Sequence, residues 1–381
     1  MSKKIFTSLG LMSGTSMDGV DASIIQSDGI NEFELISNEY CEFDRDLYQK
    51  LIELRDKLFS SKDLAQNLKH IIEIERNFTL FISKFVNSLV EKNSLTLDLI
   101  GFHGQTILHL PKEKISKQLG DGNLLSQLTK TKVVYQFRQN DLDHGGQGAP
   151  LTPIFHFLIS GILKTKFNLD FPMNIINIGG ITNVSQIKIN SYENKNLFAY
   201  DIAPGNCLID EWVRKNSNKK FDLNGDIASS GKVNNLILNQ TIDNFNIKDL
   251  NNSLDVKNFD ISFARGLCLE DGCATITKYT AYLISEGLKK IDEINKLNTL
   301  NFYLCGGGRK NKTLIKNINE YLNDQRITLK NIDDYKFDGD FIESQAFAYL
   351  AIRSYLDLPL SYPNTTRTLR PISGGIIEKN Y

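Results

Sequence analysis

The sequence has few cysteines and no arrangement of them that indicates a disulfide framework or a zinc site. Five cysteines occur in 381 residues, and no two form a C-x-x-C pair. An odd number of scattered thiols is typical of a cytoplasmic protein whose cysteines stay reduced. The five histidines also lack zinc-type spacing, so we expect no resident zinc.

Long apolar runs are missing as well. No stretch reaches the roughly 18 apolar residues that a membrane-spanning helix needs, so we expect no membrane partner. The two lysines near the start mimic a signal peptide. The apolar stretch after them is interrupted by Ser8 and Gly10 and runs into Asp18, which predicts a first strand instead.

Net charge of either sign is also missing. The 44 basic and 45 acidic side chains give a formal charge of −1, so no overall field attracts nucleic acid or an anionic membrane. The length of 381 residues exceeds what one hydrophobic core usually serves, which favours two lobes. Two common nucleotide signatures are absent too, namely G-x-G-x-x-G and a glycine loop followed by Lys-Ser/Thr.

What the sequence does contain is a polar, glycine-bent turn close to its start. The apolar runs Ile5–Met12 and Val20–Ile25 predict a hairpin with Gly14 and Gly19 at its bend. Backbone N–H groups in such a turn can bind phosphate, and Asp18 suits a divalent cation bridging to that phosphate. The alternative is an ordinary hairpin turn rich in glycine, serine and aspartate.

Polar residues follow two further expected strands. Leu97–Phe102 is predicted to end before His103, and Lys132–Phe137 before Arg138, with Asp141 shortly after. Ligands in open α/β sheets lie beyond strand ends, so these residues could form a cradle for a sugar or a carboxylate. The alternative for Arg138 and Asp141 is a surface ion pair.

The second half repeats the hairpin design. Asn174–Ile189 is predicted to be a hairpin with Gly179 and Gly180 at its bend. Later, the strand Asn301–Leu304 leads into Gly306–Gly308 and a helix. Three glycines between strand and helix allow a flat group to lie against the backbone, with the helix N-terminus near phosphate.

One acidic residue stands apart from these turns. The strand Leu197–Tyr200 is predicted to present Asp201 just before a helix that begins at Cys207. A carboxylate in this position can face a ligand, although a capping or hinge role is the alternative. Two helices are also expected: Lys62–Lys92, single or broken near Asn77, and Ile342–Leu356 with Glu343 at its start.

Together these features resemble the actin/hexokinase/Hsp70-like ATPase superfamily and, within it, the anhydro-N-acetylmuramic acid kinase family. The closer resemblance covers nearly the whole chain and keeps the order of the motifs. Those motifs are Gly14–Asp21, His103–Thr106, Phe137-Arg138, Gly145–Leu151, Asn177–Ile181, Pro204–Asn206 and Cys305–Gly308.

The resemblance implies an α/β, two-lobed actin/hexokinase-like (ribonuclease H-like) fold with a nucleotide cleft between the lobes. Lobe I is expected over residues 1–135 and 341–381, and lobe II over residues 136–340. The resemblance further implies a bacterial enzyme that acts in the cytoplasm, forms a homodimer and takes part in peptidoglycan recycling. Such enzymes use ATP, Mg²⁺ and water to open the 1,6-anhydro ring of the sugar, giving N-acetylmuramic acid 6-phosphate and ADP.

The resemblance also assigns roles to residues. Asp201 takes the place of the general base, and Asp18 that of a Mg²⁺ ligand acting through water. The ATP-binding set is Gly14, Thr15, Ser16, Met17, Asp18, Gly19, Val20, Asp21, Gly179, Gly180, Asn183, Gly306, Gly307 and Gly308. The sugar-binding set is His103, Gln105, Thr106, Arg138, Asp141, Gln147 and Glu343, and we infer that Arg138 binds the lactyl carboxylate.

The chain departs from the family pattern at a few positions. Gln136 stands where the family usually has Asp, and Ile202-Ala203 stands where it has Thr-Gly. The C-terminal Thr-Gly-Ala appears as Ser373-Gly374-Gly375. Two alternatives therefore stay open: a kinase for another anhydrosugar such as levoglucosan, and a nucleotide-binding sensor whose catalysis has decayed.

Overall fold

The computed structural model describes residues 4–189, 196–244, 254, 256, 259–295 and 300–381. The chain forms two compact units. Unit 1 contains the described residues of Met1–Thr165, of a short segment ending at Leu197, and of Phe341–Tyr381. Unit 2 contains those of Lys166–Ser191 and Phe198–Asp340. Within the described residues, no helix is both long and apolar enough to cross a lipid bilayer.

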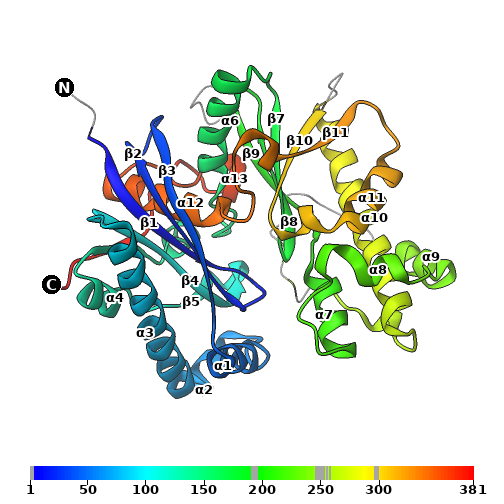
Figure 1. Cartoon of the computed structure of the whole chain (residues 1–381), viewed down its shortest axis with the longest axis horizontal. Coiled ribbons are helices and arrows are strands. Elements are labelled where there is room, and N and C mark those ends of the chain that lie inside the picture. Colours follow the sequence, from blue (N-terminus) through cyan, green and yellow to red (C-terminus); the bar gives the residue numbers. More distant parts are fainter. Residues whose placement is uncertain (1–3, 190–195, 245–253, 255, 257–258, 296–299) are drawn as a thin grey trace. The chain divides into compact units, whose positions relative to one another are not determined.

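Unit 1 is built on one mixed sheet (Figure 1). Its order is β12-β6-β4-β1-β2-β3, with β5 beside β4. The β1–β2 and β2–β3 pairs are antiparallel, whereas β1–β4 and β4–β6 are parallel. The strands are β1 (Phe6–Ser13), β2 (Gly19–Ser27), β3 (Phe33–Glu42), β4 (Leu99–Leu110), β5 (Ile115–Leu119), β6 (Lys132–Tyr135) and β12 (Ile376–Glu378).

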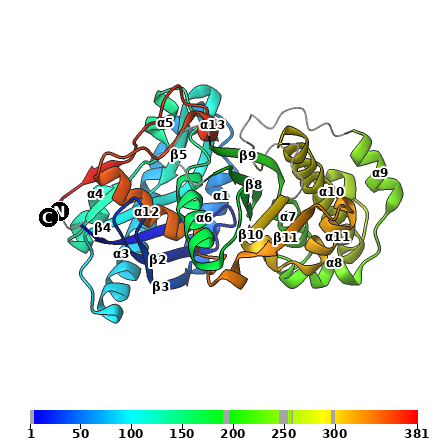
Figure 2. The same cartoon turned by 90° about the horizontal axis from the view of Figure 1, so that it is seen from above.

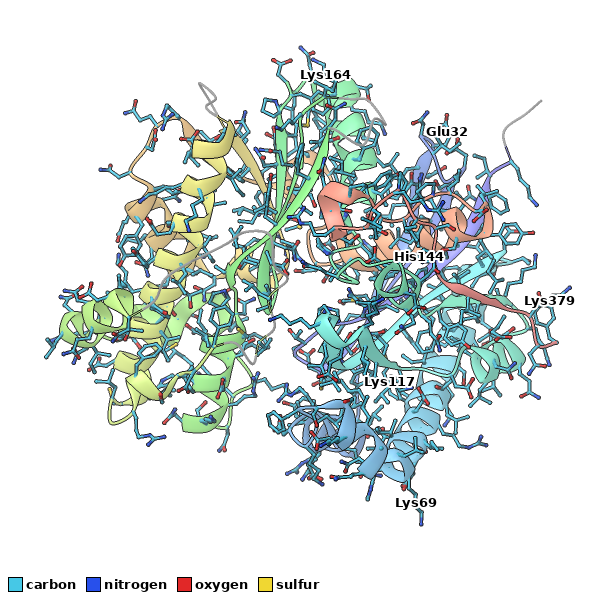
Figure 3. All side chains as sticks on the ribbon, turned by 180° about the vertical axis from the view of Figure 1, so that it is seen from behind. Glu32, Lys69, Lys117, His144, Lys164 and Lys379 are labelled. Atoms are coloured by element: carbon cyan, nitrogen blue, oxygen red, sulfur yellow. The ribbon has the colours of Figure 1, made fainter. Side chains whose placement is uncertain are left out.

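One face of this sheet is covered by α1 and α3. The apolar face of α3 packs into a core that includes Phe78 and Leu9 of β1, both fully buried. The helices of unit 1 are α1 (Arg45–Arg55), α2 (Ser61–Gln66), α3 (Leu68–Asn93), α4 (Gly122–Thr129), α5 (Gln139–Asp143), α6 (Pro153–Phe167), α12 (Ile342–Tyr355) and α13 (Pro363–Thr366). Figure 3 shows Lys69 of α3 and Lys379 pointing away from the ribbon, in keeping with their exposure.

The expected helix over 62–92 is two helices, but the break is not near Asn77. Asn77 lies on the exposed side of α3 and leaves its hydrogen bonding intact. The chain breaks instead at Asn67, where φ −100° and ψ 10° depart from helical values. Its side-chain amide there donates to the Asp63 carbonyl at 2.9 Å, which closes α2 before α3 begins.

Helix α12 packs on the same sheet at very close range (Figure 2). Two glycines on neighbouring strands permit this. A Cβ at Gly10 would lie 1.9 Å from the Ser344 carbonyl oxygen, and one at Gly101 would lie 2.1 Å from the Phe347 carbonyl oxygen. A side chain at either position would push α12 away from the sheet. The two glycines therefore allow residues 341–381 to pack against the first half of the chain.

Residues 136–165 fall in unit 1, although the expected boundary placed them in the second lobe. Their contacts explain this. Phe155 of α6 is fully buried, and its ring centroid lies 5.4 Å from that of Phe33 and 5.6 Å from that of Tyr349. The aromatic packing therefore anchors α6 to β3 and α12.

Unit 2 carries a second sheet with the order β11-β10-β7-β8-β9. With β5 and β12 left aside, the two sheets have the same strand order: β3-β2-β1-β4-β6 in unit 1 and β9-β8-β7-β10-β11 in unit 2. Counted along the chain within each unit, this order is third, second, first, fourth and fifth. The strands are β7 (Met173–Ile178), β8 (Ile181–Ile187), β9 (Leu197–Pro204), β10 (Leu300–Cys305) and β11 (Ile327–Asn331). The expected α/β, two-lobed actin/hexokinase-like fold is confirmed, because each unit has its own sheet of like design.

The other helices of unit 2 pack around α10. Trp212 of α7 donates from Nε1 to the Leu269 carbonyl at 2.9 Å, and a Cβ at Gly272 would lie 2.1 Å from its ring. The indole and the start of α10 are thus fitted together. The helices are α7 (Cys207–Asn216), α8 (Asp226–Ser230), α9 (Asn235–Asp243), α10 (Leu269–Asn295) and α11 (Lys312–Leu322).

Candidate active site

The turn predicted to bind phosphate lies between β1 and β2. The Met17 amide donates to the Gly14 carbonyl at 3.2 Å, and Met17 adopts φ 57°. Thr15 is exposed, Ser16 is half-buried, and a Cβ at Gly14 would meet nothing within 4 Å. The turn therefore presents its backbone to open space, where an anion could approach.

A buried amide holds this turn from the neighbouring strand. Gln105 of β4 accepts from the Ser13 hydroxyl at 2.5 Å and donates from Nε2 to the Gly14 carbonyl at 3.0 Å. The Gln105 side chain is 1% exposed. The structure thus brings Gln105, predicted to bind sugar, into contact with the turn predicted to bind phosphate.

β4 does not end at Phe102, as the sequence suggested, but continues to Leu110. Two features explain the extension. The strand β5 pairs with the second half of β4, which supplies partners that a local pattern cannot reveal. Gly104 adopts φ 76° in mid-strand, where a Cβ would lie 2.2 Å from the Leu119 carbonyl oxygen. His103, Gln105 and Thr106 therefore lie inside a strand rather than in a loop beyond it.

His103 and Arg138 form a pair within unit 1. Nε2 of His103 accepts from Arg138 Nε at 3.2 Å and from Nη2 at 2.9 Å, while Nη1 of Arg138 donates to the Gly148 carbonyl at 2.7 Å. A guanidinium cannot accept a hydrogen bond, so the His103 proton is on Nδ1, which donates to the Gly104 carbonyl at 2.8 Å. Burial and the nearby Arg138 charge hold the pKa of His103 well below its usual range.

Asp141 is buried among protein donors. Its Oδ1 accepts from Ser361 at 2.5 Å and from Thr366 at 2.6 Å, and its Oδ2 accepts from the Gly148 amide at 2.7 Å. The carboxylate is 2% exposed. The surface ion pair with Arg138 considered as the alternative is not what the structure shows, because Asp141 instead fastens the glycine-rich loop to the C-terminal segment.

The remaining predicted sugar-binding residues are distributed along unit 1. Gln147 donates its backbone amide to the Thr366 carbonyl at 2.7 Å. Thr106 accepts from Gln118 Nε2 at 3.2 Å. Glu343 lies half-buried in the first turn of α12. Gln105 contacts the hairpin turn and His103 contacts Arg138, whereas the grouping of the other predicted side chains around a sugar stays a prediction.

In unit 2 the predicted glycine turns converge. The Gly205 amide donates to the Gly180 carbonyl at 2.8 Å, and the Asn206 amide donates to the Gly179 carbonyl at 2.7 Å. The third turn lies against the same hairpin, since a Cβ at Gly306 would be 2.2 Å from Asn177 Oδ1 and 2.8 Å from the Ile178 carbonyl oxygen. Gly306 also adopts φ 77°, which favours glycine.

Two details of these turns were not visible in the sequence. Asn206 contacts both turns, because its Nδ2 donates to the Ile178 carbonyl at 3.4 Å and would lie 3.8 Å from a Cβ at Gly307. Asn183 of β8, predicted to bind ATP, has a buried Oδ1 that makes no hydrogen bond. An unsatisfied buried acceptor of this kind is unusual in a protein and is consistent with a place beside a ligand.

Asp201 lies within β9 rather than after it. The strand was expected to end at Tyr200 but runs on to Pro204, whose carbonyl accepts from the Thr182 hydroxyl at 3.3 Å. Asp201 is half-buried, and its Oδ2 accepts from the Leu254 amide at 2.9 Å.

Ile202, which stands where the family usually has Thr, lies on the opposite face of β9 from Asp201. Successive side chains in a strand point to opposite faces. Ile202 is 2% exposed and packs in the core, where a Cβ at Gly287 of α10 would lie 2.6 Å from it. This substitution therefore alters the packing behind β9 and leaves the Asp201 face unchanged.

Asp18 is the residue that could hold a metal ion in unit 1. Its Oδ1 accepts from the Ser16 hydroxyl at 2.5 Å, and its carbonyl accepts from the Phe43 amide at 2.9 Å. Across the described ranges, no group of three or more His, Cys, Asp and Glu side chains could hold a metal. Mg²⁺ commonly binds one or two carboxylates together with phosphate oxygens and water, so a single carboxylate beside a phosphate turn suits it.

Tyr40 of β3 is a neighbour of this turn that no sequence motif indicates. A Cβ at Gly19 would lie 2.5 Å from the Tyr40 ring. Burial and the charges of Asp18, Glu42 and Asp21 raise the pKa of Tyr40. A tyrosine on β3 carries no motif, and only the register of β2 with β3 brings it to Gly19.

Three histidines with lowered pKa values, the buried His103 and His156 and the half-buried His109, predict how stability depends on pH. Burial lowers the pKa of His156 to about 3 and that of His109 to about 4, and it holds that of His103 well below the usual range. These groups stay neutral when folded but bind a proton in the unfolded chain below about pH 6.5. Stability should therefore be full above about pH 6.5 and fall toward pH 4, by about 1.4 kcal/mol per pH unit for each fully buried histidine.

Thermal unfolding between pH 7.5 and 4.5 tests this expectation. His156→Leu should flatten the slope by about one histidine's share, about 1.4 kcal/mol per pH unit, because it removes one group that titrates only when unfolded. A slope equal to that of the parent would show that His156 does not contribute.

Comparison with known proteins places the chain in a family. The model of a family described as anhydro-N-acetylmuramic acid kinase matches residues 6–380. A protein of that description from Pelagibacter ubique is 50% identical over 383 residues, covering 100% of both chains. One from Agrobacterium fabrum is 35% identical, covering 99% of each. Among solved structures, a ROK family glucokinase from Streptomyces griseus aligns at 11% identity and TM-score 0.41, covering 91% of this chain and 99% of its own. The match to one family over nearly the full length shows that the chain belongs to the anhydro-N-acetylmuramic acid kinase family.

Proposed function

We propose that this chain uses ATP and water to convert 1,6-anhydro-N-acetylmuramic acid into N-acetylmuramic acid 6-phosphate and ADP. The observation that carries the proposal is the Gly14 turn, which accepts a hydrogen bond from Gln105 and has open space beside Gly14 where an anion could approach. Membership of the kinase family supports it. The converging turns at Gly179 and Gly306 bring further glycine backbone together in unit 2, with Gly307 exposed.

Asp201 is proposed as the general base. Its carboxylate accepts the proton of a water molecule whose oxygen bonds to the anomeric carbon, and the bond from that carbon to O6 breaks. O6 then takes the γ-phosphoryl group of ATP, and ADP leaves. The Leu254 amide donates to one carboxylate oxygen of Asp201 at 2.9 Å and so orients the group. A general base needs such orientation, because it must lie within hydrogen-bond reach of the water whose proton it accepts.

The other roles are assigned by position. Asp18 would hold Mg²⁺, which neutralises phosphate charge when bound. Arg138, oriented by His103 and Gly148, is proposed for the substrate's lactyl carboxylate. The converging glycines of unit 2 would take the adenosine and phosphates. We further propose that the reaction takes place in the cytoplasm and that the enzyme is a homodimer.

Mass spectrometry tests the reaction directly. The protein is incubated with anhydro-N-acetylmuramic acid, ATP and Mg²⁺ in ¹⁸O-water and quenched early, because the free anomeric oxygen exchanges with solvent. We expect N-acetylmuramic acid 6-phosphate carrying one solvent oxygen. Faster product formation from levoglucosan would favour the other anhydrosugar, and ATP binding without any sugar phosphate would favour the decayed sensor.

A further inference from the structure

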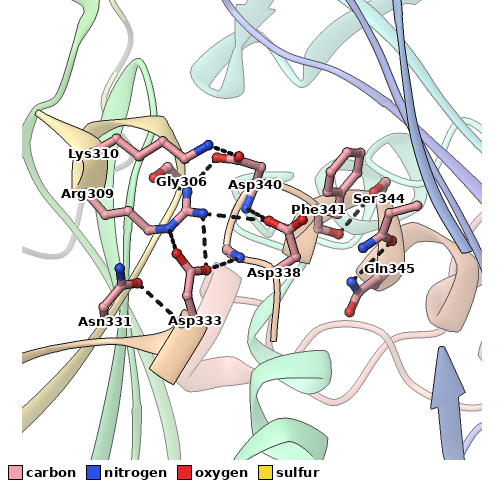
Figure 4. Close-up of polar contacts among 12 residues, drawn as sticks. Gly306, Arg309, Lys310, Asn331, Asp333, Asp338, Asp340, Phe341, Ser344 and Gln345 are labelled. Carbon is pink, nitrogen blue, oxygen red and sulfur yellow. Dashed lines mark hydrogen bonds and ion pairs between the residues drawn. The ribbon is translucent and has the colours of Figure 1, made fainter. Parts of the chain in front are cut away.

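A buried arginine follows the Gly306–Gly308 turn directly and is surrounded by carboxylates (Figure 4). Arg309 donates from Nε to Asp333 Oδ2 at 2.9 Å and from Nη2 to Asp333 Oδ1 at 3.1 Å, a bidentate pair. Its Nη1 donates to Asp340 Oδ1 at 2.5 Å. Its side chain is 2% exposed, whereas those of Asp333 and Asp340 are 37% and 31% exposed.

The same guanidinium holds the glycine turn itself. Nη1 of Arg309 also donates to the Gly306 carbonyl at 3.0 Å. The Gly306 amide donates to the Gly339 carbonyl at 2.8 Å, so both polar groups of Gly306 are bonded. Gly339 has to be glycine, because a Cβ there would lie 2.5 Å from Arg309 Nε. The turn and the segment 333–340 are therefore fitted together through one side chain.

This arrangement is not what stability alone requires. A buried ion pair is no more stabilising than well-packed apolar residues, because removing both charges from water offsets their attraction. What the guanidinium adds is direction, since its fixed fork of donors contacts Asp333, Asp340 and the Gly306 carbonyl at once. A lysine offers a point charge and cannot make this set of contacts.

We propose that Arg309 is a positioning residue for nucleotide binding, which holds the Gly306–Gly308 turn in the conformation that receives the nucleotide. The proposal rests on the proposed function, in which this turn takes the adenosine. Arg309 acts through the turn: its own donors go to protein acceptors, and the turn presents the exposed Gly307.

Arg309→Lys tests the proposal, with Asp338→Asn as the matched control. Asp338 lies farther from Arg309, at 3.6 Å, and its side chain is 45% exposed. We expect Arg309→Lys to raise the KM for ATP and the Kd for ADP about tenfold, the effect of one lost charge-assisted hydrogen bond. The kcat and the KM for sugar should stay within about twofold, and Asp338→Asn should leave all constants within that range.

The outcomes separate the possible failures. An unchanged KM for ATP, or an equal rise in both KM values, overturns the proposal, because a merely structural role would not act on the nucleotide alone. If Arg309→Lys does not fold, Asp333→Asn replaces it, and a smaller rise confined to nucleotide binding is expected. Calorimetry with ADP reports on the turn even if the parent phosphorylates no sugar, in which case the proposed function fails and this inference is still decided.

Discussion

Asp201→Asn is expected to reduce sugar phosphorylation by about 10²–10⁴-fold, the usual contribution of a general base. An amide cannot accept the proton of the attacking water, although its oxygen can still accept from the Leu254 amide. The substitution should therefore leave β9 in place. Nucleotide affinity should be retained, because the Gly179–Gly180 turn is held by the Gly205 and Asn206 amides and the Gly306 turn by Gly339 and Arg309.

Initial rates with saturating ATP and sugar measure this effect, and ADP calorimetry measures nucleotide affinity. Asp260→Asn is the matched control, because Asp260 is an exposed aspartate of the same unit whose carboxylate contacts Ser262. Near-normal turnover in Asp201→Asn would remove the base assignment. Loss of ADP binding together with turnover would show instead that Asp201 supports the nucleotide site.

Asp141→Ala is expected to lower the free energy of unfolding by about 3–5 kcal/mol, because it leaves several buried donors without an acceptor. The hydroxyls of Ser361 and Thr366 and the amide of Gly148 would lose their shared acceptor. Urea denaturation followed by circular dichroism measures the loss. The expected effect of the substitution is this loss of stability, without a measurable change in the KM for sugar.

Asp143→Ala provides the control two residues away in α5. Asp143 is exposed and accepts from Gln139 of the same helix, so its removal should change stability by less than about 0.5 kcal/mol. A stable Asp141→Ala variant with a strongly raised KM for sugar would contradict the structural role and restore Asp141 to direct sugar binding.

Local patterns in the sequence were sufficient to predict both hairpins and the strand–glycine–helix unit. Gly14 and Gly179–Gly180 stand at bends between apolar runs, and the structure has the expected strands on either side. Such features depend on the backbone freedom of glycine and on alternation over a few residues, which sequence alone expresses.

Contacts between distant segments could not be predicted in this way. β4 extends past Phe102 because β5 pairs with it, and β9 extends past Tyr200 alongside β8. Gln105 and Asp141 looked like ligand-facing residues, yet their partners are Ser13 and Ser361, which lie far from them in the chain. A polar residue near a strand end has the same appearance whether it faces a ligand or a buried donor.

The common strand order of the two sheets has a consequence for protein engineering. Among the five strands that the two sheets have in common, the longest connection joins the third to the fourth: β3 leads to β4 through α1–α3, and β9 leads to β10 through α7–α10. The first and second strands are joined by tight turns in both. The third-to-fourth crossover is thus the point at which this architecture absorbs extra length. A reporter domain inserted between α1 and α2 should be tolerated, whereas the same insertion at Gly14 should not.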